Sequence, residues 1–158
     1  MSNEEKSFPK TSINWYPGHM AKTRRQIIED LKLIDVVIEL LDARVPFSSQ
    51  NPDIADIIRG KKRIILLNKS DLADKIETDK WINKFKKENI IAISVDSNTG
   101  SGINKVFDSL NSVMKEELEK NAQNGRIGKK IRVLVLGIPN VGKSSFINRI
   151  IYKHYDIQ

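Results

Sequence analysis

The sequence contains no cysteine, so disulfide bonds and thiolate metal sites are excluded. Its two histidines do not recur at a metal-ligand spacing, and its first residues include glutamates where an export signal would be apolar. Asp35, Glu39 and Gly137 interrupt the longest apolar runs, so none is long enough to cross a membrane. These absences predict a chain without a membrane span in a reducing compartment, and we expect it in the cytoplasm.

Basic residues outnumber acidic ones: the 158 residues include 27 lysines and arginines against 20 aspartates and glutamates, a formal net charge of +7. Hydrophobic residues make up 39% and charged residues 30%, which predicts a folded globular domain. Excess positive charge favours polyanionic partners such as nucleic acid. A lysine-rich proteome would explain the same excess equally well.

Apolar runs alternate with amphipathic stretches, which predicts an α/β fold with a mostly parallel sheet and helices on both faces. Strands are expected at residues 36–41, 63–67, 90–95 and 131–136. Helices are expected at residues 21–33, 52–59, 79–87, 102–121 and 143–151. The polar residues 1–13 predict a mobile tail, and residues 121–130 predict a linker.

Residues 137–144 match the phosphate-binding pattern G-x-x-x-x-G-K-[ST] and lie between a predicted strand and a predicted helix. In such a loop, successive backbone N–H groups face one anion, and the helix N-terminus adds partial positive charge. Lys143 would reach the β- and γ-phosphates, and the Ser144 hydroxyl would ligate Mg²⁺. A chance glycine turn is the alternative. The expected nucleotide-binding residues here are Asn140, Val141, Gly142, Lys143, Ser144 and Ser145.

A second polar tetrapeptide follows the predicted strand 63–67 and has the N-K-x-D pattern of GTPases: Asn68, Lys69, Ser70 and Asp71. Guanine carries N1–H and N2–H₂ donors that one Asp71 carboxylate can accept together, and adenine lacks them. The stem of Lys69 can pack on the base, and Asn68 can brace the loop. Alone, such a tetrapeptide is more often a strand-end turn. Together with the phosphate loop, it predicts GTP or GDP as the ligand, whereas an ATP-using enzyme would require it to be accidental.

The base motif precedes the phosphate loop, which is the reverse of the order in ordinary GTPases. This order, the segment W-Y-P-G-H-M at residues 15–20 and the segment L-D-A-R-V-P at residues 41–46 resemble the ribosome biogenesis GTPase A family of circularly permuted P-loop GTPases. The resemblance implies a permuted GTPase domain over residues 14–158. It also implies that the domain is incomplete at its C-terminus, without switch I, switch II or the family's C-terminal RNA-binding domain.

The resemblance implies a GTP-binding and GTP-hydrolysing assembly factor for the large (50S) ribosomal subunit. Its partners would be ribosomal RNA and ribosomal proteins, with neither DNA nor a membrane expected. A nucleotide-gated RNA- or ribosome-binding module with negligible hydrolysis is the alternative. Because the switch segments are missing, we expect this chain by itself to be inactive as an enzyme.

The resemblance also assigns roles to single residues. Asp96, Ser97 and Asn98 would form the loop whose backbone N–H meets the guanine O6. Lys143 and His19 would be catalytic, with His19 orienting the attacking water, and Asn140 would hold a K⁺ ion. A packed loop histidine and a simple loop residue are the respective alternatives.

Two further expectations concern the sheet. The resemblance to GTPase domains implies the strand order 131–136, 36–41, 63–67 and 90–95. Two strands that would flank the first of these are missing, which leaves it as an unprotected edge. Asp42 and Arg44 follow a strand on the ligand-binding side, where they could touch the nucleotide region or a partner, or where Asp42 could simply cap a turn.

Overall fold

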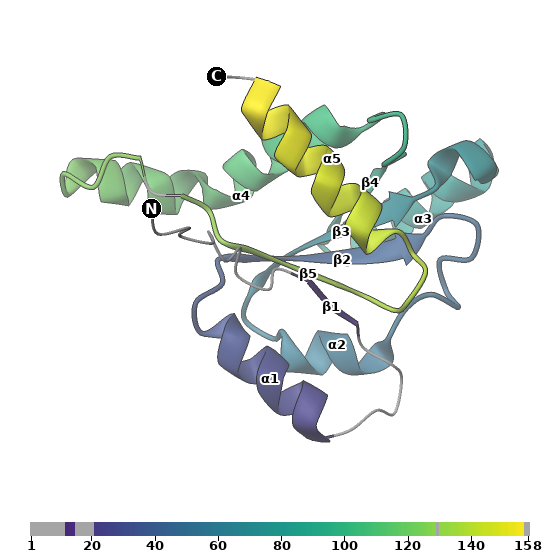
Figure 1. Cartoon of the computed structure of the whole chain (residues 1–158), viewed down its shortest axis with the longest axis horizontal. Coiled ribbons are helices and arrows are strands. Elements are labelled where there is room, and N and C mark those ends of the chain that lie inside the picture. The colour runs from purple at the N-terminus through teal and green to yellow at the C-terminus, as the bar shows by residue number, and fades with distance from the viewer. Residues whose placement is uncertain (1–11, 15–20, 129, 157–158) are drawn as a thin grey trace, which may run out of the picture.

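The computed structural model describes residues 12–14, 21–128 and 130–156. Every strand and helix predicted above is present, and helices cover both faces of one sheet (Figure 1). In chain order the elements are β1 (Ser12–Asn14), α1 (Ala21–Leu31), β2 (Val36–Asp42), α2 (Pro52–Ile57), β3 (Lys62–Asn68), the 3₁₀ helix η1 (Ser70–Leu72), α3 (Lys75–Lys87), β4 (Ile91–Ser94), α4 (Ile103–Gln123), β5 (Val133–Gly137) and α5 (Lys143–Asp156).

The sheet is parallel throughout, with the strand order β1-β5-β2-β3-β4. The predicted order of the last four strands is therefore confirmed, and so is the α/β class. In the register, Asp42 lies opposite Asn68, and Glu39 lies opposite Leu136. The ends of β2, β3 and β5 consequently lie close together at one edge of the sheet.

Strand β5 is not the sheet edge, so that prediction is wrong. Residues Ser12–Asn14 form β1 and pair in parallel with Val135, Leu136 and Gly137. This pairing covers the outer side of β5 just before the phosphate loop begins. The sheet therefore begins at Ser12, inside the segment predicted to be a tail.

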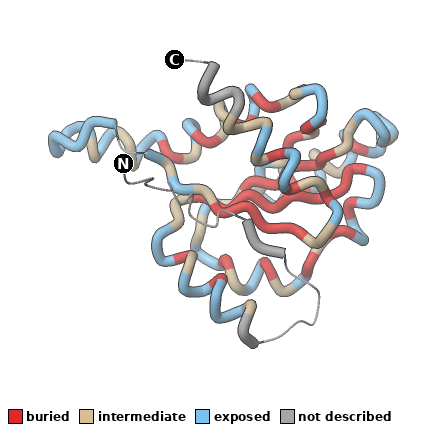
Figure 2. Tube along the Cα trace, viewed as in Figure 1, coloured by how far each residue is buried: buried red, intermediate tan, exposed pale blue. Residues whose placement is uncertain are grey.

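The core lies on both faces of β2, as the alternation of its side chains requires. Val36, Ile38 and Leu40 pack in the cluster that contains buried residues of α4 and α5. Val37 and Leu41 point to the other face, into clusters with residues of α1, α2 and α3. Figure 2 shows the strands as the buried centre between the two helical layers. Of the helices that the structure describes, none has the length and apolar character needed to cross a membrane.

Helix boundaries differ from the predicted ones where a cap decides them. Helix α3 begins at Lys75, four residues earlier than expected, because the Asp74 side chain accepts the Glu77 backbone N–H at 3.0 Å. Helix α4 continues to Gln123, so the connection to β5 is shorter than the predicted linker. The buried residues of α4 are Ile103, Val106, Leu110 and Met114, spaced three or four apart as in an amphipathic helix.

One carboxylate lies inside the core. Glu39 in β2 is 1% exposed and pairs with Arg63 of β3, whose Nε donates to Glu39 Oε2 at 2.9 Å. Among the described residues, its other oxygen has no hydrogen-bond partner. Burial raises the pKa of the Glu39 carboxyl, and Arg63 opposes this shift. The pair fixes β2 against β3 on the face covered by α1 to α3.

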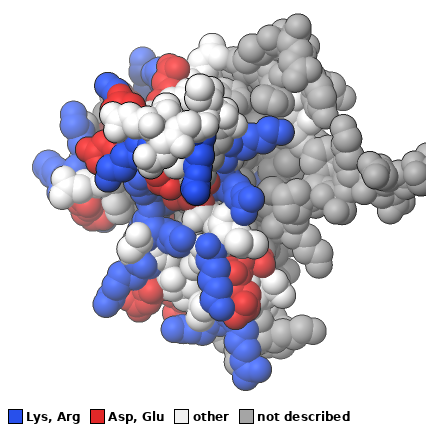
Figure 3. All heavy atoms as spheres, turned by 90° about the vertical axis from the view of Figure 1, so that its left-hand side faces the viewer, with Lys and Arg blue, Asp and Glu red and all other residues white. Residues whose placement is uncertain are grey.

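Basic side chains are spread over the edge at the amino ends of the strands. Figure 3 shows this face, with lysine and arginine side chains across the surface and acidic side chains among them. Lys62 at the start of β3 lies 3.8 Å from Glu117, and Lys61 donates to the Ile34 carbonyl at 2.9 Å. The opposite, carboxyl edge carries the sequence motifs.

Candidate nucleotide-binding site

Three loops meet at the carboxyl edge of the sheet. They follow β3, β4 and β5, and they contain the base motif, the 96–98 segment and the phosphate loop. Because β2 lies between β3 and β5, its own loop, with Asp42 and Arg44, lies among them. In parallel α/β sheets this edge is where ligands bind. The structure thus brings the sequence-predicted loops together.

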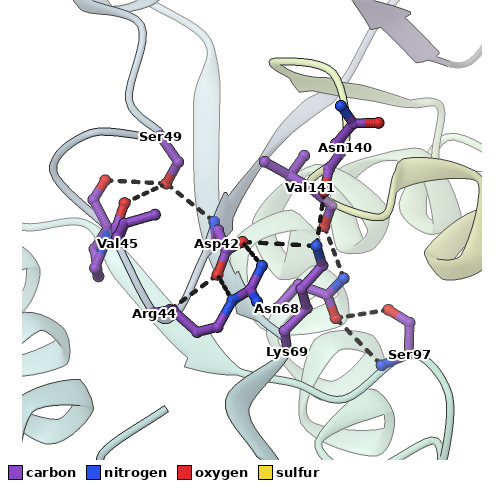
Figure 4. Close-up of polar contacts among 10 residues, drawn as sticks. Asp42, Arg44, Val45, Ser49, Asn68, Lys69, Ser97, Asn140 and Val141 are labelled. Atoms are coloured by element: carbon purple, nitrogen blue, oxygen red, sulfur yellow. Dashed lines mark hydrogen bonds and ion pairs between the residues drawn. The ribbon is translucent and has the colours of Figure 1, made fainter. Parts of the chain in front are cut away.

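Asn68 joins the three loops. Its amide nitrogen donates to the Val141 carbonyl of the phosphate loop at 2.9 Å. Its amide oxygen accepts from the backbone N–H of Ser97 at 3.2 Å and from the Ser97 hydroxyl at 2.9 Å. With 2% of the residue exposed, these bonds are made away from water (Figure 4). Asn68 therefore connects its own loop to both neighbouring loops.

The phosphate loop has the backbone form that its glycines allow. Gly142 has a φ of +92°, in the left-handed region, and a Cβ there would lie 2.4 Å from the Asn68 amide nitrogen. Helix α5 begins immediately afterwards at Lys143. Only glycine fits between the brace and the helix start.

Lys143 is folded over the phosphate loop. Its ammonium group donates to the carbonyls of Gly137 at 3.1 Å and Ile138 at 3.2 Å. Burial lowers the pKa of this amine, because a buried cation loses hydration. The two carbonyl dipoles stabilise the ammonium group only in part, and a phosphate group would stabilise it further with a full negative charge. The Lys143 ammonium group thus lies beside the position where a phosphate is expected to bind.

Lys69 connects the base motif to the other two loops. It has a φ of +60°, and its ammonium group donates to the Asn140 carbonyl at 2.8 Å. The same ammonium group lies 3.6 Å from a carboxylate oxygen of Asp42. This position lays the aliphatic stem of Lys69 along the site.

Asp42 makes hydrogen bonds that stabilise the turn after β2. Its carboxylate accepts from the Arg44 backbone N–H at 2.9 Å, from Nε at 3.0 Å and from Nη2 at 2.8 Å (Figure 4). Its own N–H donates to the Ser49 hydroxyl at 3.0 Å. Hydrogen bonding to Arg44 holds the pKa of Asp42 below its ordinary value. Asp42 therefore caps the turn after β2 and also orients Lys69.

The 96–98 segment forms a tight turn closed by two glycines with positive φ, Gly100 and Gly102. Asp96 accepts from the Asn98 N–H at 3.0 Å and from the Thr99 hydroxyl at 2.7 Å. The Thr99 bond is the main reason why the pKa of Asp96 is lowered. A backbone N–H of this loop is expected to meet guanine O6. The N–H of Ser97 donates to Asn68 and that of Asn98 to Asp96, so a base would have to share one of them.

Other predicted residues lie around this centre. Ser70 and Asp71 belong to η1, and the side chain of Asp71 is exposed beside the site. Ser144 and Ser145 are exposed in the first turn of α5. His19 lies outside the described residues, so its role stays a prediction.

Sequence reasoning missed Arg149. It lies in α5, and its Nε donates to the Ser97 carbonyl at 2.9 Å, while its Nη2 donates to the Asn98 carbonyl. Arg149 is more than 50 residues from this turn in the sequence. No local motif marks such a residue, so only the fold reveals it.

Replacing Gly142 with alanine is expected to destabilise the chain more than the same change at Gly125. Both glycines have positive φ, but nothing lies within 4 Å of a Cβ at Gly125, whereas at Gly142 the Asn68 amide is in the way. The steric conflict breaks the bond to Val141 and should add about 1–3 kcal/mol to the loss at Gly142. Urea denaturation of both variants measures the difference. Equal losses would show that Asn68 yields without cost.

The fold and the site together define a P-loop domain of the GTPase type, with its base motif ahead of its phosphate loop. A family model described as 50S ribosome-binding GTPase matches residues 132–158. The ribosome biogenesis GTPase A of Bacillus licheniformis is 48% identical over 142 residues, covering 90% of this chain and 50% of the relative. That of Bacillus cereus is 49% identical, covering 90% of this chain and 48% of the relative.

A solved structure is also similar. The crystal structure of GNP-bound YlqF from T. maritima superposes with a TM-score of 0.58 at 33% identity, over 81% of this chain and 47% of that one. Over nine tenths of its length the chain is thus similar to ribosome biogenesis GTPase A. It spans about half the length of the curated relatives it matches.

Proposed function

We propose that this chain binds GTP and GDP at the carboxyl edge of its sheet and serves in the assembly of the large ribosomal subunit. The observation that carries the nucleotide proposal is the Asn68 brace, which holds the base motif, the 96–98 turn and the phosphate loop together. A base and its phosphates could then be bound at the same time. The names of the relatives support the ribosomal part.

Guanine selection is assigned to Asp71. Its carboxylate is exposed next to Lys69, whose backbone turns through the left-handed region directly before η1. A carboxylate in this place accepts both guanine donors, and adenine offers neither of them. We therefore expect guanine nucleotides, and not adenine nucleotides, to be the ligands.

Phosphate binding is assigned to the backbone of residues 140–145 and to Lys143. When a diphosphate enters, Lys143 exchanges the Gly137 and Ile138 carbonyls for phosphate oxygens. Stronger pairing with an anion compensates for the burial that lowers the pKa of its amine. Hydrolysis would then use Lys143 to stabilise charge that develops on the phosphate, with His19 proposed to orient the water.

The residues present are compatible with Mg²⁺. The exposed Ser144 hydroxyl supplies one hard oxygen ligand, and Mg²⁺ in phosphate sites takes its other ligands from phosphates and water. In the part of the chain that the structure describes, no cluster of three acidic or histidine side chains competes for a metal. Bound Mg²⁺ would neutralise phosphate charge. We also propose that the side-chain oxygen of Asn140 binds K⁺. The side chain is exposed and points away from Lys69, whose positive charge would repel a second cation (Figure 4).

The proposed partners are the RNA and proteins of the large ribosomal subunit, in the cytoplasm. The net charge of +7 and the basic side chains at the amino edge of the sheet suit a phosphate-rich surface (Figure 3). That edge is opposite the nucleotide loops, so both could be occupied at once.

Co-sedimentation with isolated ribosomal subunits tests the ribosomal part. The chain is expected to pellet with large and not with small subunits, and less at high salt. GTP turnover stimulated by the large subunit would favour a GTP-hydrolysing enzyme over the binding-module alternative, whereas its absence is expected for this chain under either reading. Absence from the pellet in every nucleotide state would contradict the proposal.

A further inference from the structure

Arg149 holds the carbonyl groups of the turn at residues 97–98, whereas Asn68 holds the Ser97 N–H and hydroxyl. Its Nε–H donates to the Ser97 carbonyl at 2.9 Å, and its Nη2 donates to the next carbonyl, that of Asn98. A Cβ on Gly100 would lie 3.5 Å from Arg149 Cδ, so the glycine backbone packs on the stem of the arginine. Its positive charge also contributes to the lowered pKa of Asp96. Arg149 therefore interacts with the turn along its length from Asp96 to Gly100.

These contacts fix the direction of two successive peptide groups. The N–H of Ser97 points to Asn68, and the carbonyl of Ser97 points to Arg149. The N–H of Asn98, in the same peptide group as that carbonyl, points to Asp96. Since a planar peptide group turns as one unit, loss of the Arg149 bond leaves this group held only by the bond from the Asn98 N–H to Asp96.

Arg149 also connects the turn to the phosphate-loop helix. Arg149 lies on α5, the helix that begins at Lys143, and Asn68 bonds the turn at one end and the Val141 carbonyl of the phosphate loop at the other. The turn is thus held between the base motif and the phosphate-loop helix. A planar guanidinium can donate to two carbonyls in a fixed geometry, which an ammonium group cannot reproduce.

We propose that Arg149 is a positioning residue that sets base selectivity by holding the 97–98 turn in place from the phosphate-loop helix. The inference rests on the proposed binding of guanine nucleotide. Arg149 itself touches neither base nor phosphate in this scheme. It acts through the backbone of Ser97 and Asn98, so its loss should affect recognition of the base and leave recognition of the phosphates intact.

The test compares Arg149→Met and Arg149→Lys with the unaltered chain, using calorimetric titration with GDP, ADP and pyrophosphate. Methionine keeps an apolar side chain against Gly100 but has no hydrogen-bond donor. Lysine keeps the positive charge but lacks the two N–H groups that the guanidinium directs at the Ser97 and Asn98 carbonyls. We expect the preference for GDP over ADP to fall about 10-fold in the methionine variant, with pyrophosphate affinity unchanged. Lysine should restore only part of the preference. Arg126→Met, at an exposed arginine after α4, is the matched control and should change nothing.

The possible outcomes separate clearly. A melting temperature that falls while the GDP-to-ADP ratio stays constant would make Arg149 merely structural and overturn the proposal. Equal losses for GDP and pyrophosphate would overturn it as well. If Arg149→Met does not fold, the ratio in Arg149→Lys decides. An unaltered chain that binds GDP no better than ADP would instead contradict the proposed function, before any variant is compared.

Discussion

Replacing Asp71 with asparagine is expected to weaken GDP binding about 100-fold and to shift the preference toward xanthosine diphosphate. The exposed carboxylate, placed after Lys69 at the carboxyl edge, is the group assigned to accept both donors of guanine. An amide can accept only one of them and turns a donor toward the other. Xanthine carries a C2 carbonyl in place of the amino group, which suits that donor.

The control for this variant is Asp79→Asn, which removes the same charge from an exposed position on α3. It should leave the affinities for both diphosphates as they are. Competition against a fluorescent guanine nucleotide measures all three chains in one format. If Asp71→Asn kept the GDP preference of the unaltered chain, base recognition would have to be assigned to another residue.

Replacing Lys143 with alanine is expected to abolish measurable binding of nucleotide diphosphates, a loss of more than about 100-fold. Lys143 provides the cation inside the phosphate loop, and it is already held there by two carbonyls. Removing it leaves the Asn68 bond that holds the phosphate loop in place, so the fold should survive. Fluorescent GDP titration gives the affinity, and thermal unfolding reports on the fold.

Lys86→Ala on the exposed side of α3 is the matched control, because it removes the same charge from the chain. A comparable loss of GDP binding in the control would point to long-range charge rather than to the phosphate loop. Near-normal affinity in Lys143→Ala would remove the lysine from the site altogether.

Local patterns were sufficient to predict the main layers of the fold. The alternation of short β-branched runs with amphipathic stretches located β2, β3, β4 and β5 to within two residues at each end. The order of these strands came from the resemblance to GTPase domains. Because all four run parallel, their carboxyl ends had to meet, and that geometry collected the predicted loops.

Features that depend on distant residues could not be predicted in this way. The segment Ser12–Asn14 is too short and polar to read as a strand, and it becomes one only because β5 offers it backbone partners. The ion pair between Glu39 and Arg63 and the clamp by Arg149 depend likewise on contacts across 24 and 52 residues. The early start of α3 is different, since Asp74 and Glu77 form a capping signal that is local in the sequence.

The role of the 96–98 turn shows how structure sharpens a sequence resemblance. The resemblance assigned its backbone N–H to the guanine base, and the structure adds that Asn68 already accepts the Ser97 N–H. A bound base must therefore share this donor or draw the turn toward itself. In either case Asn68 and Arg149 determine how far the turn can move.

The central claim is that the gathered loops form a guanine-nucleotide site, and calorimetric titration of the chain with GDP and with ADP in the presence of Mg²⁺ tests it most directly. The account predicts binding of GDP with one site per chain and an affinity for ADP lower by a factor of about 100 or more. Equal affinities for the two diphosphates would contradict it, and so would the absence of GDP binding.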